Sequence, residues 1–330
     1  MSSNRFVDNL IIVKQNAYGL TRDAALLADA IGRAGAGTCE TVGVRDRSVA
    51  DVLYGRRRTR RAFHIERAFP NWFSASEENW LIPNQERFPK RQLYRLKGID
   101  LVLAKTRHAE EIFAARGAAT RYLGFTSEDR FDPAIAKNWN GFYHLAGAST
   151  LKGTDDLVAL WKRHPEWPTL CLVQKQELAP RAVPPNIRLI ARYLSDQELR
   201  ELQNSHGIHL CPSRAEGWGH HILEGMSCRS VVLVTDAAPM NEHVDETCGI
   251  LVAANHRQSR HLGFSYRVDP DALEATVQKI LSLPEEEKIA IGSRARQRFE
   301  EIDAAFTRRL ADLLQTHDSM GKGEWADVHA

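Results

Sequence analysis

A short stretch of the chain combines acidic side chains and glycines at the point where an expected strand gives way to an expected helix. The apolar run Ile208–Cys211 predicts a strand, and residues 220–227 predict a helix. Between them, Gly217 and Gly219 allow the backbone to approach a ligand closely. Free N–H groups at a helix start attract anions, and the helix dipole adds to this attraction. The stretch therefore predicts a diphosphate site at the carboxyl end of a parallel strand.

Two carboxylates flank that helix start. Glu216 lies in the loop, and Glu224 follows eight residues later in the expected helix. A carboxylate in the position of Glu224 can accept hydrogen bonds from both hydroxyls of a ribose, while Glu216 lies nearer a sugar. The alternative is a loop acid and an exposed helix acid, because isolated short motifs recur by chance. The residues alone leave both interpretations open.

Strand-like and helix-like segments alternate along the chain and must position this site. The apolar run Leu10–Val13 is followed by a helical stretch over 21–33, and similar pairs recur to the helices expected over 271–281 and 284–314. Such alternation predicts an α/β fold with parallel sheets. Residues 56–97 carry the weakest pattern, with a strand predicted only over 79–84.

The chain length and the interruption at Pro133 predict two domains. At roughly 100–200 residues per domain, 330 residues correspond to two. Pro133 and the polar stretch after it interrupt the alternation just before a fresh strand, which favours a boundary within 132–140. The residues after about His317 are expected to form a loose tail.

The charge balance excludes a strong overall field. Lys and Arg total 44 against 42 for Asp and Glu, a net charge of +2, so nothing global favours nucleic acid or a membrane. The segment Arg56–Arg61 is locally basic, with the sequence Arg-Arg-Arg-Thr-Arg-Arg. It is either a solvated loop or helix start, or a contact for an anionic partner such as a lipid headgroup, a phosphorylated acceptor or nucleic acid.

Cysteine usage and hydropathy indicate a cytoplasmic protein. The five cysteines show no C-x2-C spacing, and Cys171 and Cys211 lie in apolar runs where thiols behave as small hydrophobes. This pattern fits a reducing compartment. The N-terminus lacks the basic-then-apolar pattern of a signal peptide, and no run approaches the roughly 18 apolar residues that span a bilayer. Any membrane contact is expected to be peripheral.

Residues 210–226 resemble the Glu-x7-Glu motif of family 4 retaining glycosyltransferases (glycosyl transferases group 1), which reads P-S-x-x-E-G-F-G-L-x-x-L-E-A-M-A. Trp218 stands at the aromatic position of that motif. The other matching positions are Pro212, Ser213, Glu216, Gly217, Gly219, Leu223, Glu224 and Met226.

Segments upstream are similar to the same family. Gly147 followed by Lys152-Gly153 resembles the family's G-R-x-x-x-x-K-G loop. Residues 124–133 resemble its N-G-V-D-x-x-x-F-x-P linker, and residues 186–202 resemble its N-V-x-F-x-G stretch with the helix that follows. The resemblance covers about 124–252, whereas the N-terminal half matches in pattern only.

The resemblance implies a GT-B fold, with two Rossmann-like lobes whose parallel sheets face a central cleft. Residues 1–136 would form the acceptor-binding lobe and residues 137–300 the lobe that binds the nucleotide-sugar. Residues 301–330 would form a helix that crosses back to the first lobe, plus the tail. The implied activity is that of a retaining hexosyltransferase in polysaccharide biosynthesis. It would move a sugar from a UDP- or GDP-sugar to a glycan, lipid-linked or other acceptor, without a metal or other cofactor.

The family's roles carry over to the matching positions. Lys152 would pair with the donor phosphate and Glu216 would contact the transferred sugar, which makes these two the predicted catalytic residues. Glu224 would bind the ribose, and backbone near residues 218–220 would hold the diphosphate. The predicted donor-binding residues are Gly147, Ser149, Thr150, Arg192, Tyr193, Arg214, Gly217, Trp218, Gly219, His220 and Glu224.

The chain departs from the family at one phosphate contact. The arginine of the family's G-R pair is Ala148 here, which removes one expected cation. Hydroxyls of Ser149 and Thr150, or the charges of Arg214 and His220, would compensate.

Acceptor contacts are expected in the N-terminal lobe, and an ordinary structural role stays equally open for each candidate. The family's Gly-Gly loop is reduced to Gly19 here. The main candidates are Tyr18, Gly19, His64, Glu66 and Asn84, with Asn16, Glu86, Lys105 and Thr106 as further ones.

Three other functions stay open from the sequence. The same fold could serve a nucleotide-sugar epimerase or a phosphorylase-like enzyme. A non-catalytic protein that binds a nucleotide or glycan is the second alternative, favoured by Ala148. A nucleic-acid-modifying transferase is the third, and it depends only on Arg56–Arg61.

Overall fold

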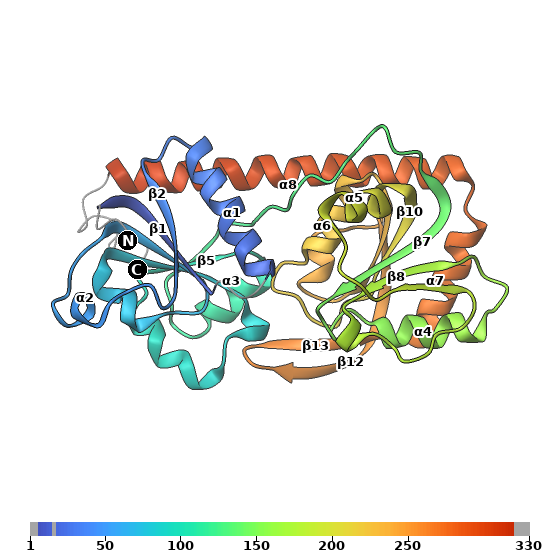
Figure 1. Ribbon diagram of the computed structural model, residues 1–330, viewed down its shortest axis with the longest axis horizontal. Coiled ribbons are helices and arrows are strands. Elements are labelled where there is room, and N and C mark those ends of the chain that lie inside the picture. Colours follow the sequence, from blue (N-terminus) through green and yellow to red (C-terminus); the bar gives the residue numbers. More distant parts are fainter. Residues whose placement is uncertain (1–5, 15–17, 320–330) are drawn as a thin grey trace. The chain divides into compact units, whose positions relative to one another are not determined.

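The computed structural model describes residues 6–14 and 18–319. Contacts divide the chain into two compact units (Figure 1). Unit 1 consists of residues 1–126, 260–263 and 302–330, and unit 2 consists of residues 127–259 and 264–301. Each unit is built around its own sheet.

The sheet of unit 1 has the order β2-β1-β3-β4-β5-β6, and neighbouring strands run parallel. Its strands are β1 (Val7–Val13), β2 (Cys39–Gly43), β3 (Thr59–Glu66), β4 (Ser76–Pro83), β5 (Leu101–Ala104) and β6 (Thr120–Tyr122). The helices around it are α1 (Tyr18–Arg33), α2 (Val49–Leu53) and α3 (Arg107–Ala114), with the 3-10 turns η1 (Pro70–Ala75), η2 (Gln85–Arg87) and η3 (Lys90–Gly98).

Strand β3 lies in the middle of this sheet, between β1 and β4, although the sequence predicts no strand over its residues. Its first half contains two arginines, which mask the apolar alternation. Arg61 is buried, and its guanidinium lies 5.8 Å from the centre of the Trp80 ring. The cation is therefore accommodated against an aromatic face inside the unit.

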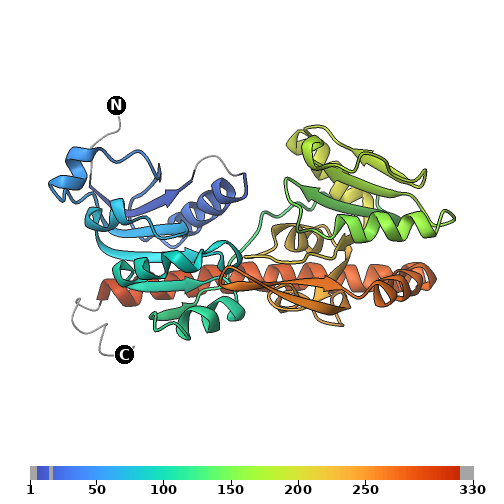
Figure 2. The same ribbon diagram turned by 90° about the horizontal axis from the view of Figure 1, so that it is seen from below.

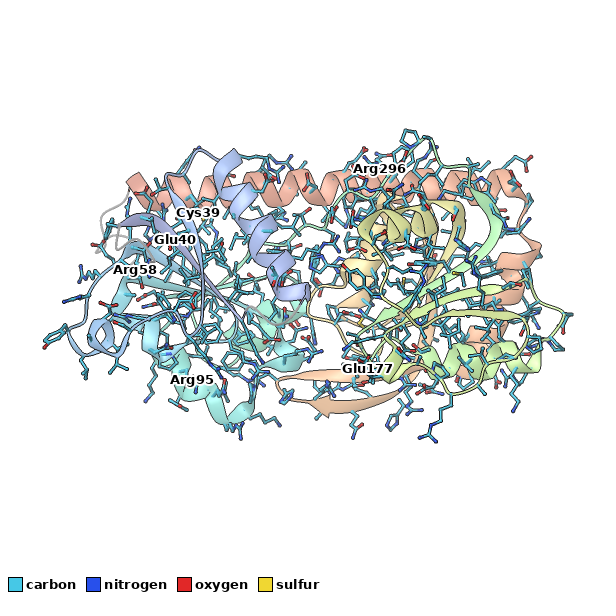
Figure 3. The ribbon with its side chains drawn as sticks, viewed as in Figure 1. Cys39, Glu40, Arg58, Arg95, Glu177 and Arg296 are labelled. Carbon is cyan, nitrogen blue, oxygen red and sulfur yellow. The ribbon has the colours of Figure 1, made fainter. Side chains whose placement is uncertain are left out.

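The structure splits the basic run Arg56–Arg61 between a loop and β3. Arg58 is buried and its Nη2 donates to both carboxylate oxygens of Glu40, at 3.3 and 3.2 Å. Both side chains are labelled in Figure 3. Arg61 is buried as well, whereas Arg56 and Arg57 are exposed. The run is neither a helix start nor one continuous cationic surface, because strand alternation turns Thr59 and Arg61 inward.

The sheet of unit 2 has the order β13-β12-β11-β10-β7-β8-β9, and the pairs from β12 to β9 run parallel. Its strands are β7 (Asn138–Gly147), β8 (Leu170–Gln174), β9 (Ile187–Ile190), β10 (His206–Cys211), β11 (Val231–Asp236), β12 (Ile250–Arg260) and β13 (Gly263–Val268). Its helices are α4 (Thr154–Arg163), α5 (Asp196–Ser205), α6 (His220–Ser227), α7 (Pro270–Ser282) and part of α8 (Glu285–Ser319), with the 3-10 turns η4 (Gln176–Leu178) and η5 (Met240–Glu242).

Helices cover both faces of this sheet, with α4 and α7 on one face and α5 and α6 on the other (Figure 1). A core that includes Phe142, Trp161 and Val277 fills the space beneath α4 and α7. Tyr143 and Cys171 point to the opposite face, where they pack with Leu202 of α5. Side chains of β7 therefore point alternately to the two faces of the sheet. Because helices cover both faces, the strand is apolar on both.

The helix α8 is a single unbroken helix (Figure 2), and its residues are shared between the two units. Residues 285–301 group with unit 2, and the remainder group with unit 1. Residues 320–330, which include most of the predicted tail, lie outside the described residues. No helix within the described ranges is long and apolar enough to cross a membrane. The five cysteines are free thiols, and Cys171 and Cys211 are buried as predicted.

A buried arginine holds the start of unit 2 against helix α5. The side chain of Arg130 is fully buried, and its Nε donates to Gln203 Oε1 at 2.9 Å. Its Nη1 donates to Asp196 Oδ1 at 2.6 Å and to Glu128 Oε1 at 3.0 Å. Contacts therefore group residues 127–136 with unit 2, ahead of residue 137 where the sequence starts the second lobe.

We expect Arg130→Met to lower the free energy of unfolding of unit 2 by about 2–4 kcal/mol, because Gln203 would lose its charged donor in a buried position. The loss stays below that of a fully buried ion pair, since the Asp196 side chain is 61% exposed. Thermal unfolding followed by calorimetry measures the change. Arg181→Met, at an exposed arginine, is the control, and an equal effect of the two substitutions would contradict the role assigned to Arg130.

Candidate active site

The predicted donor site lies at the point of unit 2 where the strand order reverses. Strand β7 lies between β10 and β8, so the chain leaves β7 in one direction and later returns to its other side. The loops after the carboxyl ends of β7 and β10 therefore lie next to each other, which is where open parallel sheets bind ligands. These loops carry Lys152 and Glu216.

The two predicted catalytic side chains contact each other directly. Lys152 Nζ donates to Glu216 Oε1 at 2.6 Å. The side chains are 16% and 11% exposed, so the pair is partly shielded yet reachable from solvent. A charge-assisted hydrogen bond of this length is among the stronger polar contacts in proteins.

A histidine outside the sequence prediction holds the lysine from a second side. Lys152 Nζ lies 3.1 Å from His221 Nδ1, and His221 Nε2 lies 3.0 Å from Ser213 Oγ. Because an ammonium group can only donate, Nδ1 must accept, and the ring proton is assigned to Nε2, which donates to Ser213. Burial and the nearby Lys152 charge hold the pKa of His221 well below its usual value. His221 is therefore a neutral acceptor that positions the lysine.

Backbone contacts fix the two loops against each other. The Arg214 N–H donates to the Leu151 carbonyl at 2.7 Å. Gly153 has a φ of 74°, and a Cβ at this position would overlap the Pro212 carbonyl oxygen. Only glycine satisfies both demands at once, so the Lys-Gly pair is needed to bring Lys152 to the loop that carries Glu216.

A second buried histidine ties β7 to this loop region. His144 Nδ1–H donates to the Leu210 carbonyl at 2.7 Å, and Nε2 accepts from Thr154 Oγ1 at 3.0 Å. Burial lowers the pKa of His144 to about 4. The neutral ring therefore links strand β10 to the first residue of α4.

The start of α6 is arranged as an anion site. Gly219 precedes the helix with a φ of 98°, and no side chain of the described residues caps it there. Trp218 is buried; its Nε1–H donates to Ser127 Oγ at 3.1 Å, and its carbonyl accepts from His243 Nε2 at 2.6 Å. The Ser127 hydroxyl also lies 2.9 Å from His220 Nδ1. These contacts hold the backbone that the sequence assigns to the diphosphate.

Glu224 is buried on the inner face of α6, only 2% exposed. Its Oε2 accepts from Gln203 Nε2 at 2.8 Å, and the Gln203 carbonyl oxygen Oε1 is held by Arg130. Arg130, Gln203 and Glu224 thus form a chain of polar contacts beneath the helix. The ribose contact assigned to Glu224 stays a prediction, because so little of the side chain is exposed.

The residues expected to replace the missing family arginine have other contacts. Arg214 Nη2 donates to Asp156 Oδ2 at 2.9 Å, in the first turn of α4. Ser149 Oγ accepts from the Leu151 N–H at 3.1 Å, while Thr150 is exposed. Open space lies where a Cβ of Gly147 would be. Arg214 would have to leave Asp156 to bind a phosphate.

The residues expected near the base follow the edge strand β9. Tyr193 is 88% exposed, and Arg192 Nη2 donates to Glu198 Oε1 at 2.6 Å. Residues 188–192 line a shallow depression on the surface of unit 2. An exposed aromatic ring beside a depression is suited to stacking on a base, and this role stays a prediction.

Three of the predicted acceptor residues follow the carboxyl ends of strands in unit 1 or lie beside them. Asn84 Oδ1 accepts from Lys105 Nζ at 3.2 Å, and the same ammonium contacts Asp23 Oδ2 at 2.5 Å. Glu66 ends β3 with a φ of 70° and is 9% exposed, and its Oε2 lies 3.5 Å from Arg67 Nε. Gly19, in the first turn of α1, is exposed.

The acceptor contact assigned to His64 stays a prediction, because the side chain has no exposed surface. The side chain is 0% exposed, and both ring nitrogens are engaged inside the unit. Nε2 lies 3.0 Å from Asn79 Oδ1, and Nδ1 accepts from the Phe69 N–H at 3.3 Å. Asn16 and the side chain of Tyr18 lie outside the described residues.

The arrangement in unit 2 is suited to an anion carried by a sugar. Lys152 would supply a cation, the start of α6 would supply backbone N–H groups, and Glu216 would supply an acceptor for hydroxyls. Within residues 6–14 and 18–319, no group of three His, Cys, Asp or Glu side chains is arranged to hold a metal ion.

Comparison with protein families matches a segment that includes Glu216 and Glu224 and begins after Lys152. Residues 157–282, from α4 to α7, match the family model described as glycosyl transferases group 1. The sequence matches no curated protein.

Solved structures with the same fold cover nearly the whole chain. A glycosyltransferase from Rickettsia africae is 15% identical with a TM-score of 0.70, and the match covers 96% of this chain and 100% of that one. Alr3699/HepE of Anabaena, solved in complex with UDP and glucose, is 14% identical with a TM-score of 0.71, covering 94% and 100%. A sucrose-phosphate synthase from Thermosynechococcus elongatus is 13% identical with a TM-score of 0.68, covering 94% and 98%. At these identities the likeness shows the fold, which is GT-B.

Buried neutral histidines make the stability of unit 2 depend on pH. Burial lowers the pKa of His144 and His243 to about 4 and that of His209 to about 3, against 6.5 for an exposed ring. Burial and the nearby Lys152 charge hold the pKa of His221 well below 6.5. Below pH 6.5 the unfolded chain binds protons at these rings while the folded unit does not. Stability is therefore complete above pH 6.5 and is lost as the pH falls toward 4, by about 1 kcal/mol per pH unit for each ring.

We expect the thermal unfolding midpoint of the protein to fall steadily between pH 7 and pH 5. His209→Gln should lower the slope of this dependence, whatever it does to the midpoint itself. His256→Gln, at an exposed histidine, is the matched control and should leave the slope as it is. A midpoint that stays constant over this range would show that the buried rings take up protons without cost.

Proposed function

We propose that this chain, whose residues 157–282 match the glycosyl transferases group 1 model and which has the GT-B fold, is a retaining glycosyltransferase whose donor site is the Lys152–Glu216 site of unit 2. The donor is a nucleoside diphosphate sugar. The complex of Alr3699/HepE with UDP and glucose supports a UDP-sugar, and GDP-sugars are the alternative.

The observation that carries this proposal is the contact between Lys152 and Glu216 at the reversal point of the sheet. The Glu216 carboxylate contacts the Lys152 ammonium group in the structure. A diphosphate bound at the start of α6 would compete for the same ammonium, and the helix dipole would favour it. Lys152 would then move from the carboxylate to the phosphate, which frees Glu216 to accept hydroxyls of the sugar.

The reaction forms a bond between the acceptor oxygen and the anomeric carbon and breaks the bond from that carbon to the β-phosphate oxygen. Negative charge develops on the leaving diphosphate, and Lys152 with the α6 backbone would stabilise it. The acceptor attacks from the face that the leaving group vacates, and the leaving phosphate takes the acceptor's proton. Glu216 positions the sugar in this scheme and is not the nucleophile.

Charge neutralisation by Lys152 and by helix N–H groups makes a metal ion unnecessary in this mechanism. The acceptor would bind at the carboxyl edge of the unit 1 sheet, where Asn84 and Glu66 lie, and a growing glycan or glycolipid is the class we favour. Placement in polysaccharide biosynthesis and a hexose as the transferred sugar are parts of the same proposal.

The decisive experiment screens UDP- and GDP-sugars for release of the nucleoside diphosphate, in EDTA, with a glycan or glycolipid acceptor mixture. We expect release from one donor. Lys152→Ala and Glu216→Gln should each lower kcat/KM by about 100–1000-fold, because each removes a group that contacts charge or hydroxyls in the transition state.

Lys162→Ala, at an exposed lysine of α4, and Glu201→Gln, at an exposed acid of α5, are the matched controls and should retain full activity. Activity that disappears in EDTA would remove the metal-independent part of the proposal. If no donor is consumed but a nucleotide raises the unfolding midpoint, and Lys152→Ala abolishes that shift, the site binds nucleotide without catalysis and the transferase assignment fails.

A further inference from the structure

The short helix α2 exposes apolar side chains on a part of unit 1 that the donor and acceptor sites do not use. Val49 is 75% exposed, Leu53 is 78% exposed and Tyr54, directly after the helix, is 77% exposed. Val52 is 37% exposed, and the helix contains no buried residue. Figure 1 shows α2 at the rim of unit 1, outside its sheet. Apolar side chains gathered on one surface helix usually mark a contact with a partner or a membrane.

The helix is held in a defined position, so its exposure is a feature of the fold. The buried guanidinium of Arg47 donates from Nη2 to the Asp51 and Arg56 carbonyls, each at 3.1 Å, and to Ser74 Oγ at 3.0 Å. Its Nη1 donates to the Asn71 carbonyl. One arginine thereby fastens both ends of the segment to η1.

Exposed positive charge lies beside this apolar tip. Residues 45–61 contain seven arginines and two aspartates, but Arg47, Arg58 and Arg61 are buried, so the exposed arginines are Arg45, Arg56 and Arg57. Arg56 and Arg57, directly after the helix, have side chains that are 57% and 61% exposed.

We propose that α2 with Tyr54, Arg56 and Arg57 is a docking surface for an anionic lipid bilayer. Leu53, Val49 and Tyr54 would enter the region between headgroups and acyl chains, as apolar faces of interfacial helices do. The two arginines would contact lipid phosphates while their stems lie along the apolar region. This proposal does not depend on sugar transfer.

The size of the tip favours a lipid surface over a protein partner. A stable protein interface buries about 800 Å² on each side, which three side chains of a five-residue helix and the adjoining Tyr54 cannot supply. A bilayer needs no complementary shape and accepts a small protruding tip. The positive charge specifies anionic lipids.

The existing contacts of the arginines do not prevent this binding. Arg56 Nη1 lies 3.3 Å from Asp51 Oδ1, and Arg57 Nη1 lies 3.3 Å from Glu77 Oε1. Exposed ion pairs of this kind contribute little and are screened by salt. A guanidinium also has donors left after one such contact.

The tip lies at the amino-terminal edge of the unit 1 sheet. Arg57 contacts Glu77 near the start of β4, and Arg58 contacts Glu40 near the start of β2. Asn84 and Glu66, the candidate acceptor contacts, lie at the opposite, carboxyl edge. Docking through α2 therefore leaves that edge uncovered.

Flotation of the full-length chain with vesicles tests the proposal, using phosphatidylcholine alone and phosphatidylcholine mixed with phosphatidylglycerol. We expect binding to the anionic vesicles that weakens as salt is added. Leu53→Ser should weaken this binding by about tenfold. Arg56→Ala and Arg57→Ala should each weaken it by about fivefold, and only on anionic vesicles.

Two matched controls lie in unit 2. Leu178→Ser changes another exposed leucine, and Arg181→Ala another exposed arginine, and both should bind vesicles like the unsubstituted chain. Unchanged unfolding midpoints would show that each variant is folded.

Three outcomes would overturn the proposal. These are no flotation with anionic vesicles, equal flotation of Leu53→Ser and Leu178→Ser, or equal binding to neutral and anionic vesicles. Self-association without vesicles that Leu53→Ser abolishes, measured by sedimentation, would assign the tip to a second copy of the chain instead. A chain that floats but releases no nucleotide would refute the transferase and leave the docking surface intact.

Discussion

The partly buried ion pair between Lys152 and Glu216 is the contact on which the arrangement of unit 2 depends. Two charges leave bulk water only when the fold brings them together and satisfies them, and several features do so here. The reversal of strand order at β7 places the two loops side by side. Gly153 allows the close approach to Pro212, and the Arg214 N–H joins the loops. The pair therefore holds the Lys152 ammonium group at the place where a bound diphosphate would need a cation.

The neighbours of the pair bear on how Lys152 alone could bind a phosphate, because Ala148 replaces the arginine that is the family's second cation. A charged histidine at 221 would repel Lys152, whereas the neutral ring accepts a hydrogen bond from its ammonium group. His144 is also neutral, because burial lowers its pKa to about 4. An anion entering the loop region would therefore compete for Lys152 with the Glu216 carboxylate and meet no charged imidazole at these two positions.

The sequence predicts unit 2 well because each of its elements is locally consistent. The bounds of α6 are those predicted, and Ser195 caps α5 with a complete capping box. Prediction from the sequence fails where contacts between distant residues decide whether a segment forms a strand or a side chain is buried. Strand β3 contains Arg61, which lies against the Trp80 ring, and it follows Arg58, which contacts Glu40. Neither neighbour is visible in a local stretch of sequence. His64 follows the same rule, because its burial depends on Asn79 from the next strand. The sequence could not predict the contact of His221 with Lys152, because helical periodicity cannot distinguish a buried core histidine from one that contacts a lysine.

The basic segment shows how one sequence feature can divide into two physical roles. Pleating turns Arg61 into the sheet, and Arg58 is buried against Glu40, where both help to fix β3 and can no longer meet a partner. Arg56 and Arg57 precede the strand and stay exposed beside the apolar face of α2. If the whole run formed one surface, every arginine in it would be able to contact an anionic partner. The structure instead leaves Arg56 and Arg57 for this contact and places the apolar side chains of α2 beside them. Charge combined with apolar surface distinguishes an interfacial surface from a merely cationic one.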